Sequence, residues 1–456
     1  MEIQMYNHPQ KAKAFISDTK KMQWHNQALW YVRAKRDKAT KEIDEFEALR
    51  ESASHIKEHT LKHLGYYLKE FEKNAKANGI EVLWAKDAKE HNALVEQILK
   101  QHNAKNIVKS KSMLTEECGL NPYLEQRGYN ISDTDLGERI VQLASQHPSH
   151  IVLPAIHLSK EDVSDIFAKH LNSEPNNTDP TYLTQVARKD LRAKFLEADV
   201  AISGVNFALA KEGGFVVCTN EGNADMGTSL APVHIASMGI EKLIPSAKEL
   251  SVFTSILARS ATGQAITTYT THFIKPHPNK KIYIILVDNQ RSDLISSQNK
   301  DALKCIRCGA CMNTCPVYRR SGGHSYQSTI PGPIGSLLAS SKDITNYASL
   351  PFACSLCASC DNVCPVKIDL HTQLYTNRVQ AIKHPEYKAK KQTLSLVAYI
   401  LSRPKLYKTV MRIYRFIAPK LPRKLIYNRY NIWGKTREMP EVAPKSFEQI
   451  YKERFV

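Results

Sequence analysis

Long hydrophobic runs are missing from this sequence of 456 residues. Its longest mainly apolar stretch, residues 394–401, is far shorter than the roughly 20 residues that a membrane-spanning helix needs. Residues 1–11 also lack the apolar core of a secretory signal. We therefore expect a cytoplasmic protein, with peripheral binding to the inner face of a membrane left open.

Nucleotide-cofactor fingerprints are missing as well. The chain has neither the G-x-G-x-x-G motif of a dinucleotide-binding turn nor a G-x-x-x-x-G-K-[S/T] phosphate loop. Flavin and nicotinamide chemistry therefore have no signal in this sequence. A site that removes hydrogen from a substrate need not lie in this chain.

Acidic residues are scarce near the C-terminus. Residues 376–437 hold sixteen lysines and arginines against one acid, Glu386, and account for +15 of the formal net charge of +18. Apolar residues stand between these cations, which predicts a basic amphipathic tail broken by Pro404, Pro419 and Pro422. Such a tail can dock on an acidic partner subunit or on an anionic membrane surface. Nucleic acid is disfavoured as a partner, because the chain shows no recognised nucleic-acid fold.

What the sequence does have is a concentrated set of cysteines. Eight of the ten lie between residues 305 and 364, in two copies of the spacing C-x-x-C-x-x-C-x-x-x-C-P. This is the bacterial ferredoxin run, in which the fourth cysteine ligates the cluster held by the other run. Two runs therefore predict two [4Fe-4S] clusters. We assign Cys305, Cys308, Cys311 and Cys364 to one cluster, and Cys354, Cys357, Cys360 and Cys315 to the other.

Zinc and disulfide bonds are the competing interpretations of these cysteines. Structural zinc sites usually pair cysteines from separated knuckles, and three cysteines in C-x-x-C-x-x-C are one too many for a knuckle. Disulfides are disfavoured in a reducing cytosol. Cys118 and Cys218 lie outside both runs, where a buried small side chain is favoured over a reactive thiol.

Four regions are predicted along the chain. They are N-terminal helices at 1–79, an α/β domain at 80–295, a helical double-cluster domain at 296–382 and the basic tail at 383–456. Apolar spacing over residues 9–78 predicts two long helices, for which the sequence offers no chemistry. The segment between the two cysteine runs could cover the clusters, form a docking surface or serve as a connector.

The middle domain alternates short apolar runs with helical patterns, which predicts a mainly parallel sheet. Strands are expected at Glu81–Trp84, Asn106–Val108, His150–Leu153, Val200–Ser203, Gly214–Thr219 and Lys281–Val287. Helices are expected at Lys89–His102, Leu136–Gln146, Lys160–Leu171, Leu183–Ala198 and Ser246–Ala258.

Polar loops follow several of these predicted strands. Ligands of such folds lie at the carboxyl ends of the strands, so these loops predict a pocket for a small anion or an acyl-bearing ligand. Its candidate residues are Lys111, Glu117, Asn206, Asn220, Glu221, Asn223 and Asp225. The alternative is that these loops are ordinary turns and that Lys109 and Lys111 are solvated. His234, shortly after, is expected to be a hydrogen-bonded core residue.

Several segments of the middle domain resemble the LUD domain. They include Lys109-Ser110-Lys111-Ser112-Met113, Thr115-Glu116-Glu117, Thr134-Asp135-Leu136-Gly137-Glu138, Pro148-Ser149-His150-Ile151-Val152, Asn206-Phe207-Ala208, Thr219-Asn220-Glu221-Gly222-Asn223-Ala224-Asp225, Gly239-Ile240-Glu241-Lys242 and Arg259-Ser260-Ala261-Thr262-Gly263-Gln264. Together with the two cysteine runs and the loop at 327–335, residues 10–440 resemble the iron-sulfur subunits of L-lactate-utilisation systems. The order of Lys211 and Glu212 is shifted from the pattern of that family, so no catalytic role is assigned to Glu212.

The resemblance implies a sugar-isomerase or CoA-transferase-like α/β fold for the middle domain. It also implies electron transfer, together with partner subunits, in the oxidation of L-lactate to pyruvate, with a quinone-linked acceptor possible near a membrane. Two other functions stay open. The LUD domain could itself be a transferase or ligase for an acyl or phosphorylated substrate, with structural clusters, or the chain could be a scaffold subunit.

Overall fold

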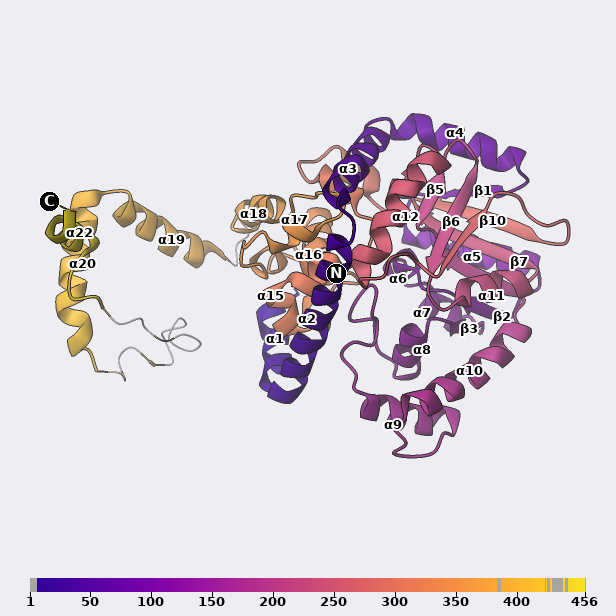
Figure 1. Cartoon of the computed structure of the whole chain (residues 1–456), viewed down its shortest axis with the longest axis horizontal. Helices are drawn as coiled ribbons and strands as arrows, with labels where there is room; N and C mark the ends of the chain where they lie inside the picture. Colours follow the sequence, from indigo (N-terminus) through magenta and orange to yellow (C-terminus); the bar gives the residue numbers. More distant parts are fainter. Residues whose placement is uncertain are drawn as a thin grey trace. The chain divides into compact units, whose positions relative to one another are not determined.

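The computed structural model describes residues 6–383, 387–422, 424, 427–428, 438 and 442–455. The chain divides into two compact units, Met1–Ala381 and Ile382–Val456. The first unit contains the α/β domain and both cysteine runs, and it is described first (Figure 1).

The larger sheet of the first unit is built from parallel pairs of strands, which confirms the predicted α/β class. Its order is β1-β10-β7-β4-β2-β3. The bounds are β1 Glu81–Ala85, β2 Asn106–Lys109, β3 Asn130–Asp133, β4 Val200–Gly204, β7 Val233–Gly239 and β10 Lys281–Val287. Strand β10 is an apolar run because both of its faces are buried: Ile284 packs on one side of the sheet and Ile285 on the other.

Helices cover both faces of this sheet. Helices α5 (Ala88–Gln101), α6 (Met113–Glu117) and α7 (Leu120–Glu125) pack on one face, and α4 (Leu64–Ala77) and α11 (Asn223–Leu230) contribute to the core on the other. Helices α8 (Leu136–Leu143), α9 (Lys160–Leu171) and α10 (Pro180–Leu196) share a smaller apolar core of their own.

A smaller sheet lies between the larger sheet and the cysteine runs. Its order is β8-β5-β6-β9, with bounds β5 Phe207–Leu209, β6 Gly214–Thr219, β8 Leu243–Ile244 and β9 Tyr269–Phe273. Alternate residues of β6 face opposite ways: Phe215 joins the core of the larger sheet, whereas Val216 joins the core that contains the cysteines. Helix α12 (Ala247–Ala261) packs in that second core.

The N-terminal region differs from its prediction of two long helices. Within the described residues it forms α1 (His8–Ser17), α2 (Thr19–Lys41), α3 (Phe46–Lys62) and α4. The break before α2 has a local cause, since the Asp18 carboxylate accepts a hydrogen bond from the Lys21 N–H and caps that helix. Helices α1 and α2 lie against α15 (Pro316–Ser321) of the cysteine region (Figure 1).

Several predicted elements of the α/β domain are corrected by the structure. Residues His150–Leu153 form a bend and not a strand, and α8 ends at Leu143, just before Ser145 takes a left-handed backbone conformation with φ of 53°. Helix α10 begins earlier than predicted, at Pro180, because the Asp179 carboxylate caps it. Strands β3, β5, β7, β8 and β9 were not among the predicted strands.

The cysteine region is helical, as predicted. It contains α13 (Arg291–Ile295), η2 (Lys300–Lys304), α14 (Ala310–Thr314), α15, η3 (His324–Tyr326), α16 (Gly332–Lys342), η4 (Leu350–Phe352), α17 (Ser359–Val363) and α18 (Leu370–Ala381). Its apolar side chains join those of α2, α3 and α12 in one core. The cysteine region and the LUD-like domain therefore share a continuous packed interior.

The second unit contains α19 (Lys388–Leu401), α20 (Pro404–Ile417), η6 (Ala418–Lys420) and α22 (Phe447–Phe455). An ion pair of 2.6 Å between Lys408 and Glu448 joins α20 to α22. This unit exposes many large apolar side chains, among them Leu396, Leu401, Ile413, Phe416, Phe447 and Phe455. Glu386, Arg423, Arg429, Lys435 and Arg437 of the predicted basic tail lie outside the described residues.

Candidate functional site

The two cysteine runs adopt the same backbone conformation. In the first run Arg307 and Gly309 have φ values of 61° and 76°, and in the second run Leu356 and Ala358 have φ values of 56° and 55°. In each run the N–H of the first of these residues donates to the sulfur of the run's first cysteine, at 3.4 and 3.3 Å. A short helix follows each time, α14 or α17. The shared spacing thus gives the two runs the same backbone turn, which brings the thiols of each run together.

The thiols gather in two small cradles. The first cradle is lined by Cys305, Cys308, Cys311 and Cys364. The second cradle is lined by Cys315, Cys354, Cys357 and Cys360. Each cradle thus takes three thiols from one run and the fourth from the other run, which is the crossed arrangement expected from the spacing.

The spread of the thiols fits a cluster better than a single metal ion. Among the described residues, no three cysteine sulfurs lie within 4.8 Å of one another. A tetrahedral zinc site with Zn–S bonds of about 2.3 Å requires sulfurs about 3.8 Å apart. The first cradle is also walled by apolar side chains such as Ile306, Ile334 and Val366, which exclude water. The donor set therefore suits iron-sulfur clusters.

Burial differs between the cradles. In the first cradle Cys308, Cys311 and Cys364 are buried, whereas in the second cradle Cys357 is exposed. One cradle therefore lies inside the unit, and the other reaches the surface.

Arginines of the N-terminal helices donate hydrogen bonds to the backbone at the end of the second cysteine run. Arg50 donates to the carbonyl oxygen of Cys364 at 3.0 Å from Nε and 2.8 Å from Nη2, and Arg36 donates to the carbonyl of Val363 at 3.3 Å. Both come from α2 or α3, which had offered no chemistry in the sequence. No sequence signal marked these arginines, because their partners are distant in the chain.

The segment between the runs covers both cradles. Ile334 lines the first cradle and Pro333 lines the second. Helix α16 is mostly buried and packs against α18. Of the three roles left open for this segment, covering is the one that its position supports.

A bend of the LUD-like domain also reaches the first run. His150 accepts hydrogen bonds at Nδ1 from the N–H groups of Val152 and Leu153, both at 3.0 Å. The ring proton is therefore on Nε2, which donates to Asn313 at 3.0 Å. Burial lowers the pKa of His150 to about 3, so the ring is neutral. A Cβ at Gly309 would lie 3.0 Å from this ring, so glycine leaves it room.

A cavity of about 260 Å³ opens where the strands of the larger sheet end. Gly204 at the end of β4 and Gly239 at the end of β7 line it, as expected for an α/β sheet. It brings together six of the seven predicted pocket residues: Lys111, Glu117, Asn206, Asn220, Glu221 and Asn223. Asp225 is not in the lining, and it accepts a hydrogen bond from Thr271 instead.

One end of the cavity is rich in carboxyl groups. Lys111 donates to Asp135 at 2.7 Å and to the carbonyl of Val152 at 3.2 Å. Burial opposes the charge of this ammonium, yet Asp135 raises the pKa of Lys111 overall. Burial and the neighbouring Asp135 also raise the pKa of Glu221. Hydroxyl groups of a ligand would find hydrogen-bond acceptors here.

Lys109, left open as a solvated lysine, is fully buried behind this end. Its ammonium lies 2.7 Å from Asp133, 3.0 Å from Glu116 and 3.6 Å from Glu138. Burial raises the pKa of Glu138 to about 8. The group is a closed ion-pair network beneath the loop that carries Lys111.

The other end of the cavity is rich in cations. Arg291 pairs with Glu241 at 2.6 Å and with Glu117 at 3.0 Å, and Arg307 lies 3.6 Å from Glu117. Although burial opposes its charge, Glu241 has its pKa lowered to about 2 by the neighbouring guanidinium groups. A Cβ at Gly239 would lie 2.1 Å from the Glu241 carboxylate, so this ion pair requires glycine there.

Lys242 and Arg307 also line the cationic end, and neither was among the candidate pocket residues, although Lys242 belongs to one of the LUD-like segments. Arg307 carried a possible signal, since it stands between two cluster cysteines where the second run has Leu356. Cys308 lines both this cavity and the first cradle. The cavity and the cradle thus share a wall.

The remaining sequence candidates are structural. His234 is buried and bonds to Ser203 at 2.7 Å, as expected for a core histidine. Cys118 is buried and Cys218 is half-buried, and burial raises the pKa of each thiol to about 12. Neither thiol is a ready nucleophile.

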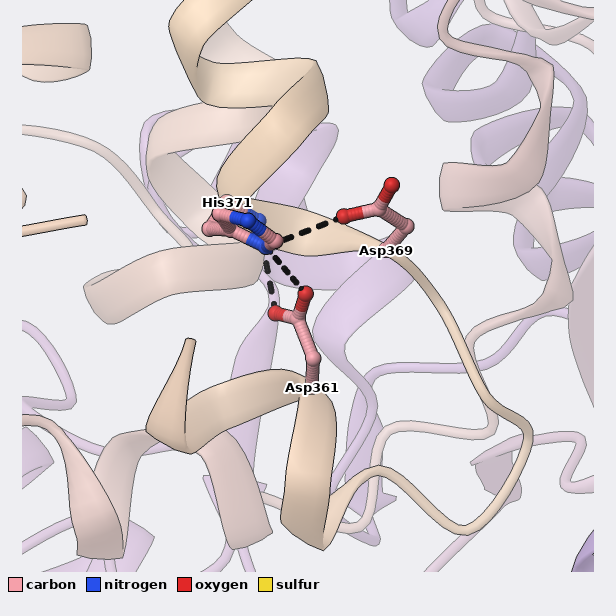
Figure 2. A group of neighbouring side chains, drawn as sticks. All are labelled: Asp361, Asp369 and His371. Atoms are coloured by element: carbon pink, nitrogen blue, oxygen red, sulfur yellow. Dashed lines mark hydrogen bonds and ion pairs between the residues drawn. The ribbon is translucent and has the colours of Figure 1, made fainter. Parts of the chain in front are cut away.

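A polar group joins the second run to α18. Figure 2 shows the imidazole of His371 between two carboxylates, with Nδ1 2.5 Å from Asp361 and 3.1 Å from Asp369. Asp361 follows Cys360 and also accepts from the N–H groups of Leu370 and His371. Asp361 raises the pKa of His371. These hydrogen bonds account for the positions of the three side chains.

The described part of the chain offers no candidate for a bilayer-crossing helix, since no helix in it is both long and apolar enough. The exposed apolar side chains of α19 and α20 stand among lysines and arginines instead.

Three family models match the chain in order. Residues 68–294 match the LUD domain, residues 301–368 match a 4Fe-4S dicluster domain, and residues 381–456 match the C-terminal region of lactate utilisation protein B.

Full-length relatives agree with these matches. Lactate utilization protein B of Bacillus cytotoxicus is 40% identical over 91% of this chain and 90% of its own length. The protein of that name from Geobacillus thermodenitrificans is 43% identical over 80% of this chain and 79% of its own length. An Escherichia coli relative, named as the uncharacterized electron transport protein YkgF, is 39% identical over 92% of this chain and 91% of its own length.

Proposed function

Because this chain belongs to the lactate utilisation protein B family, we propose that it transfers electrons through two [4Fe-4S] clusters in a multi-protein system that oxidises L-lactate to pyruvate. The observation that carries the proposal is the pair of four-thiol cradles, each completed by a cysteine of the other run. Electron transfer is also the role named for the Escherichia coli relative.

The cradles lie close enough to act as a pair. Helices α14 and α17 pack against each other, and the hydroxyls of Thr314 and Ser359 lie 2.5 Å apart between the runs. A [4Fe-4S] cluster supplies one-electron chemistry when bound, so a two-electron oxidation is divided between two clusters. The residues of this chain exclude water, donate N–H groups to the sulfurs and surround the clusters with fixed charges, which together set the potentials.

We propose that the exposed second cradle faces a partner protein. Electron transfer needs close approach, and Cys357 is exposed whereas no thiol of the first cradle is. The basic, apolar surface of the second unit supports docking on an acidic partner subunit or on an anionic membrane near a quinone-linked acceptor. Flotation with anionic vesicles and with neutral vesicles distinguishes these two docking surfaces. Binding to the anionic vesicles alone supports the membrane, and binding to neither supports the acidic partner subunit.

The proposed function is tested by lactate-driven reduction. The chain is combined anaerobically with its partner subunits, L-lactate is added, and cluster absorbance and EPR are followed. We expect bleaching in the visible range and the appearance of reduced-cluster signals, with no response to D-gluconate as a control acid. Clusters that stay oxidised, although dithionite reduces them, would contradict the electron-transfer role.

The cavity supports a second candidate function. A polar cavity at the carboxyl ends of parallel strands favours an LUD domain that acts on an acyl or phosphorylated substrate, with clusters that only stabilise the fold. Lactate-driven reduction separates this function from electron transfer. A pure scaffold role would leave the cavity without a ligand.

A further inference from the structure

The cavity of the LUD domain has one wall in common with a cluster cradle. Cys308 lines both, whereas no thiol of the second cradle lines the cavity. Arg307 precedes Cys308 and directs its side chain to the cavity, where its buried Nη1 has no hydrogen-bond partner among the described residues. A ligand at this end would therefore lie beside the first cluster and not beside the second.

The cationic end of the cavity has positively charged groups whose hydrogen-bond donors are not all used within the protein. The carboxylates of Glu117 and Glu241 are already engaged by Arg291, and Lys342 also approaches Glu117 at 3.8 Å. Lys242 is half-buried in the lining, and no described residue hydrogen-bonds or ion-pairs with its ammonium. Two cations thus reach the cavity with unused donors, which is a costly arrangement unless an anion completes it.

We propose that this cavity binds a small hydroxy- or oxo-carboxylic acid, with the carboxylate between Lys242 and Arg307. A planar carboxylate suits the fork of a guanidinium, and an ammonium beside it adds a second charge-assisted contact. At the opposite end, Asp135 and Glu221 offer acceptors to a hydroxyl on a longer acid, or to ordered water beside a shorter one. The amide of Asn206 also lines the cavity, with its oxygen occupied by the N–H of Cys218 at 2.9 Å and its nitrogen left for the ligand.

The size of the cavity limits the ligand. A volume of about 260 Å³ is below the range of pockets that hold drug-sized molecules, and it suits an acid of a few carbons with ordered water. Electron transfer through the clusters requires no ligand here, so this inference goes beyond the proposed function.

Binding also has an electrostatic consequence. An anion next to Cys308 disfavours the reduced, more negative form of the first cluster and lowers its reduction potential. The second cluster would lie farther from the bound anion, because none of its thiols lines the cavity. Occupancy of the cavity should therefore shift the reduction potential of the first cluster more than that of the second.

Calorimetric titration of the cluster-loaded protein tests the proposal with L-lactate, pyruvate and inorganic phosphate as probes. We expect one or both acids to bind, and Lys242→Gln to weaken binding by about tenfold or more through loss of a charge-assisted contact. Lys242→Arg should retain binding, and the exposed Lys248→Gln is the matched control that should not change it. All variants are compared at equal iron content.

Two results would overturn the proposal. One is no binding of either acid at millimolar concentration, whether or not phosphate binds, and the other is unchanged binding in Lys242→Gln. A redox titration with the bound acid gives a second readout, in which one of two potentials should fall more than the other, and this shift should vanish in Lys242→Gln. Equal shifts of both potentials would contradict the shared wall. Both measurements use this chain without its partners, so they stand apart from the test of lactate-driven reduction.

Discussion

The two cysteine runs share one spacing and one backbone turn, but they lie in different surroundings. The first run packs against the LUD domain, with His150 on one side and Arg307 directed into the cavity. The second run has Leu356 at the position of Arg307, and its Cys357 reaches the surface. Spacing therefore specifies how the thiols converge, whereas the surrounding fold decides what can approach each cluster.

This difference predicts an order in which the two clusters carry electrons. The first cradle lies next to a cavity, and the second cradle lies where a partner protein can come close. Electrons would pass between a site inside the unit and a surface contact through the two cradles in turn. The predictions below test how independent and how unequal the two cradles are.

The largest effect is expected from the crossing cysteine Cys364→Ala. Although it belongs to the second run, it lines the first cradle, so its loss should remove the inner cluster and about half of the iron. Iron analysis and EPR after anaerobic purification measure this. Cys118→Ala, outside both cradles, should retain full iron content. Loss of the cluster of the second cradle instead would contradict the assignment of Cys364 to the first cradle.

Cys308 and Cys357 are the second cysteines of their runs, and replacing each of them tests whether the unequal burial of the two cradles matters for stability. Cys308→Ala should lower the midpoint of thermal unfolding by about 5 °C or more relative to Cys357→Ala, because it empties a buried cradle inside the shared core. Calorimetry of both variants, each with one cluster left, makes the comparison. Equal losses would mean that the two cradles contribute equally to the fold.

The N-terminal helices should matter for the cradles although they hold no thiol. Arg50→Gln removes hydrogen bonds to the carbonyl of Cys364 and should cost about 2 kcal/mol in unfolding free energy, since the donor is charged and mostly buried. Denaturant unfolding measures it. Arg320→Gln, on an exposed position of α15, serves as the control and should change stability little.

Acidification should affect His150 and His371 in opposite directions, because their pKa shifts have opposite signs. Burial lowers the pKa of His150 to about 3, so its contribution to stability is present above the ordinary value near 6.5 and is lost as pH falls. Asp361 raises the pKa of His371, so that contribution is present at low pH and is lost as pH rises through the raised value. Lowering pH from 7 to 5 should therefore cost up to about 2 kcal/mol of unfolding free energy at His150, beside the first cradle, whereas His371, beside the second cradle, should cost none.

Unfolding of the intact protein and of His150→Gln, compared at pH 7 and pH 5, checks this sign. The variant should lose less stability than the parent between the two pH values. His272→Gln replaces an exposed histidine and should follow the parent. A larger acid loss in His150→Gln would contradict the neutral, buried state of the ring.

Much of the fold was predictable where burial and sequence pattern agree. Strand β10 was predicted with its observed bounds because its residues are apolar on both faces. Strand β7 was missed although it is central, because it carries His234 and Ser237. Both are satisfied inside the protein, His234 by Ser203 and Ser237 by His91 on α5, and such pairs cannot be read from one strand alone.

The converse error occurred at residues 150–153, where an apolar run predicted a strand. In the structure these side chains form walls of the cavity and the first cradle instead of a sheet face. The crossing of the cysteines was predictable from spacing. The hydrogen bonds of Arg50 and the place of Lys242 in the cavity lining were not, since both depend on segments far apart in the chain.

Anaerobic iron and sulfide analysis, with EPR of the dithionite-reduced protein, tests the central claim most directly. The account predicts about eight irons per chain and the broadened signal of two interacting reduced clusters. About four irons, or a single zinc, would contradict the two cradles as cluster sites and would leave the LUD cavity as the first candidate for the activity of this protein.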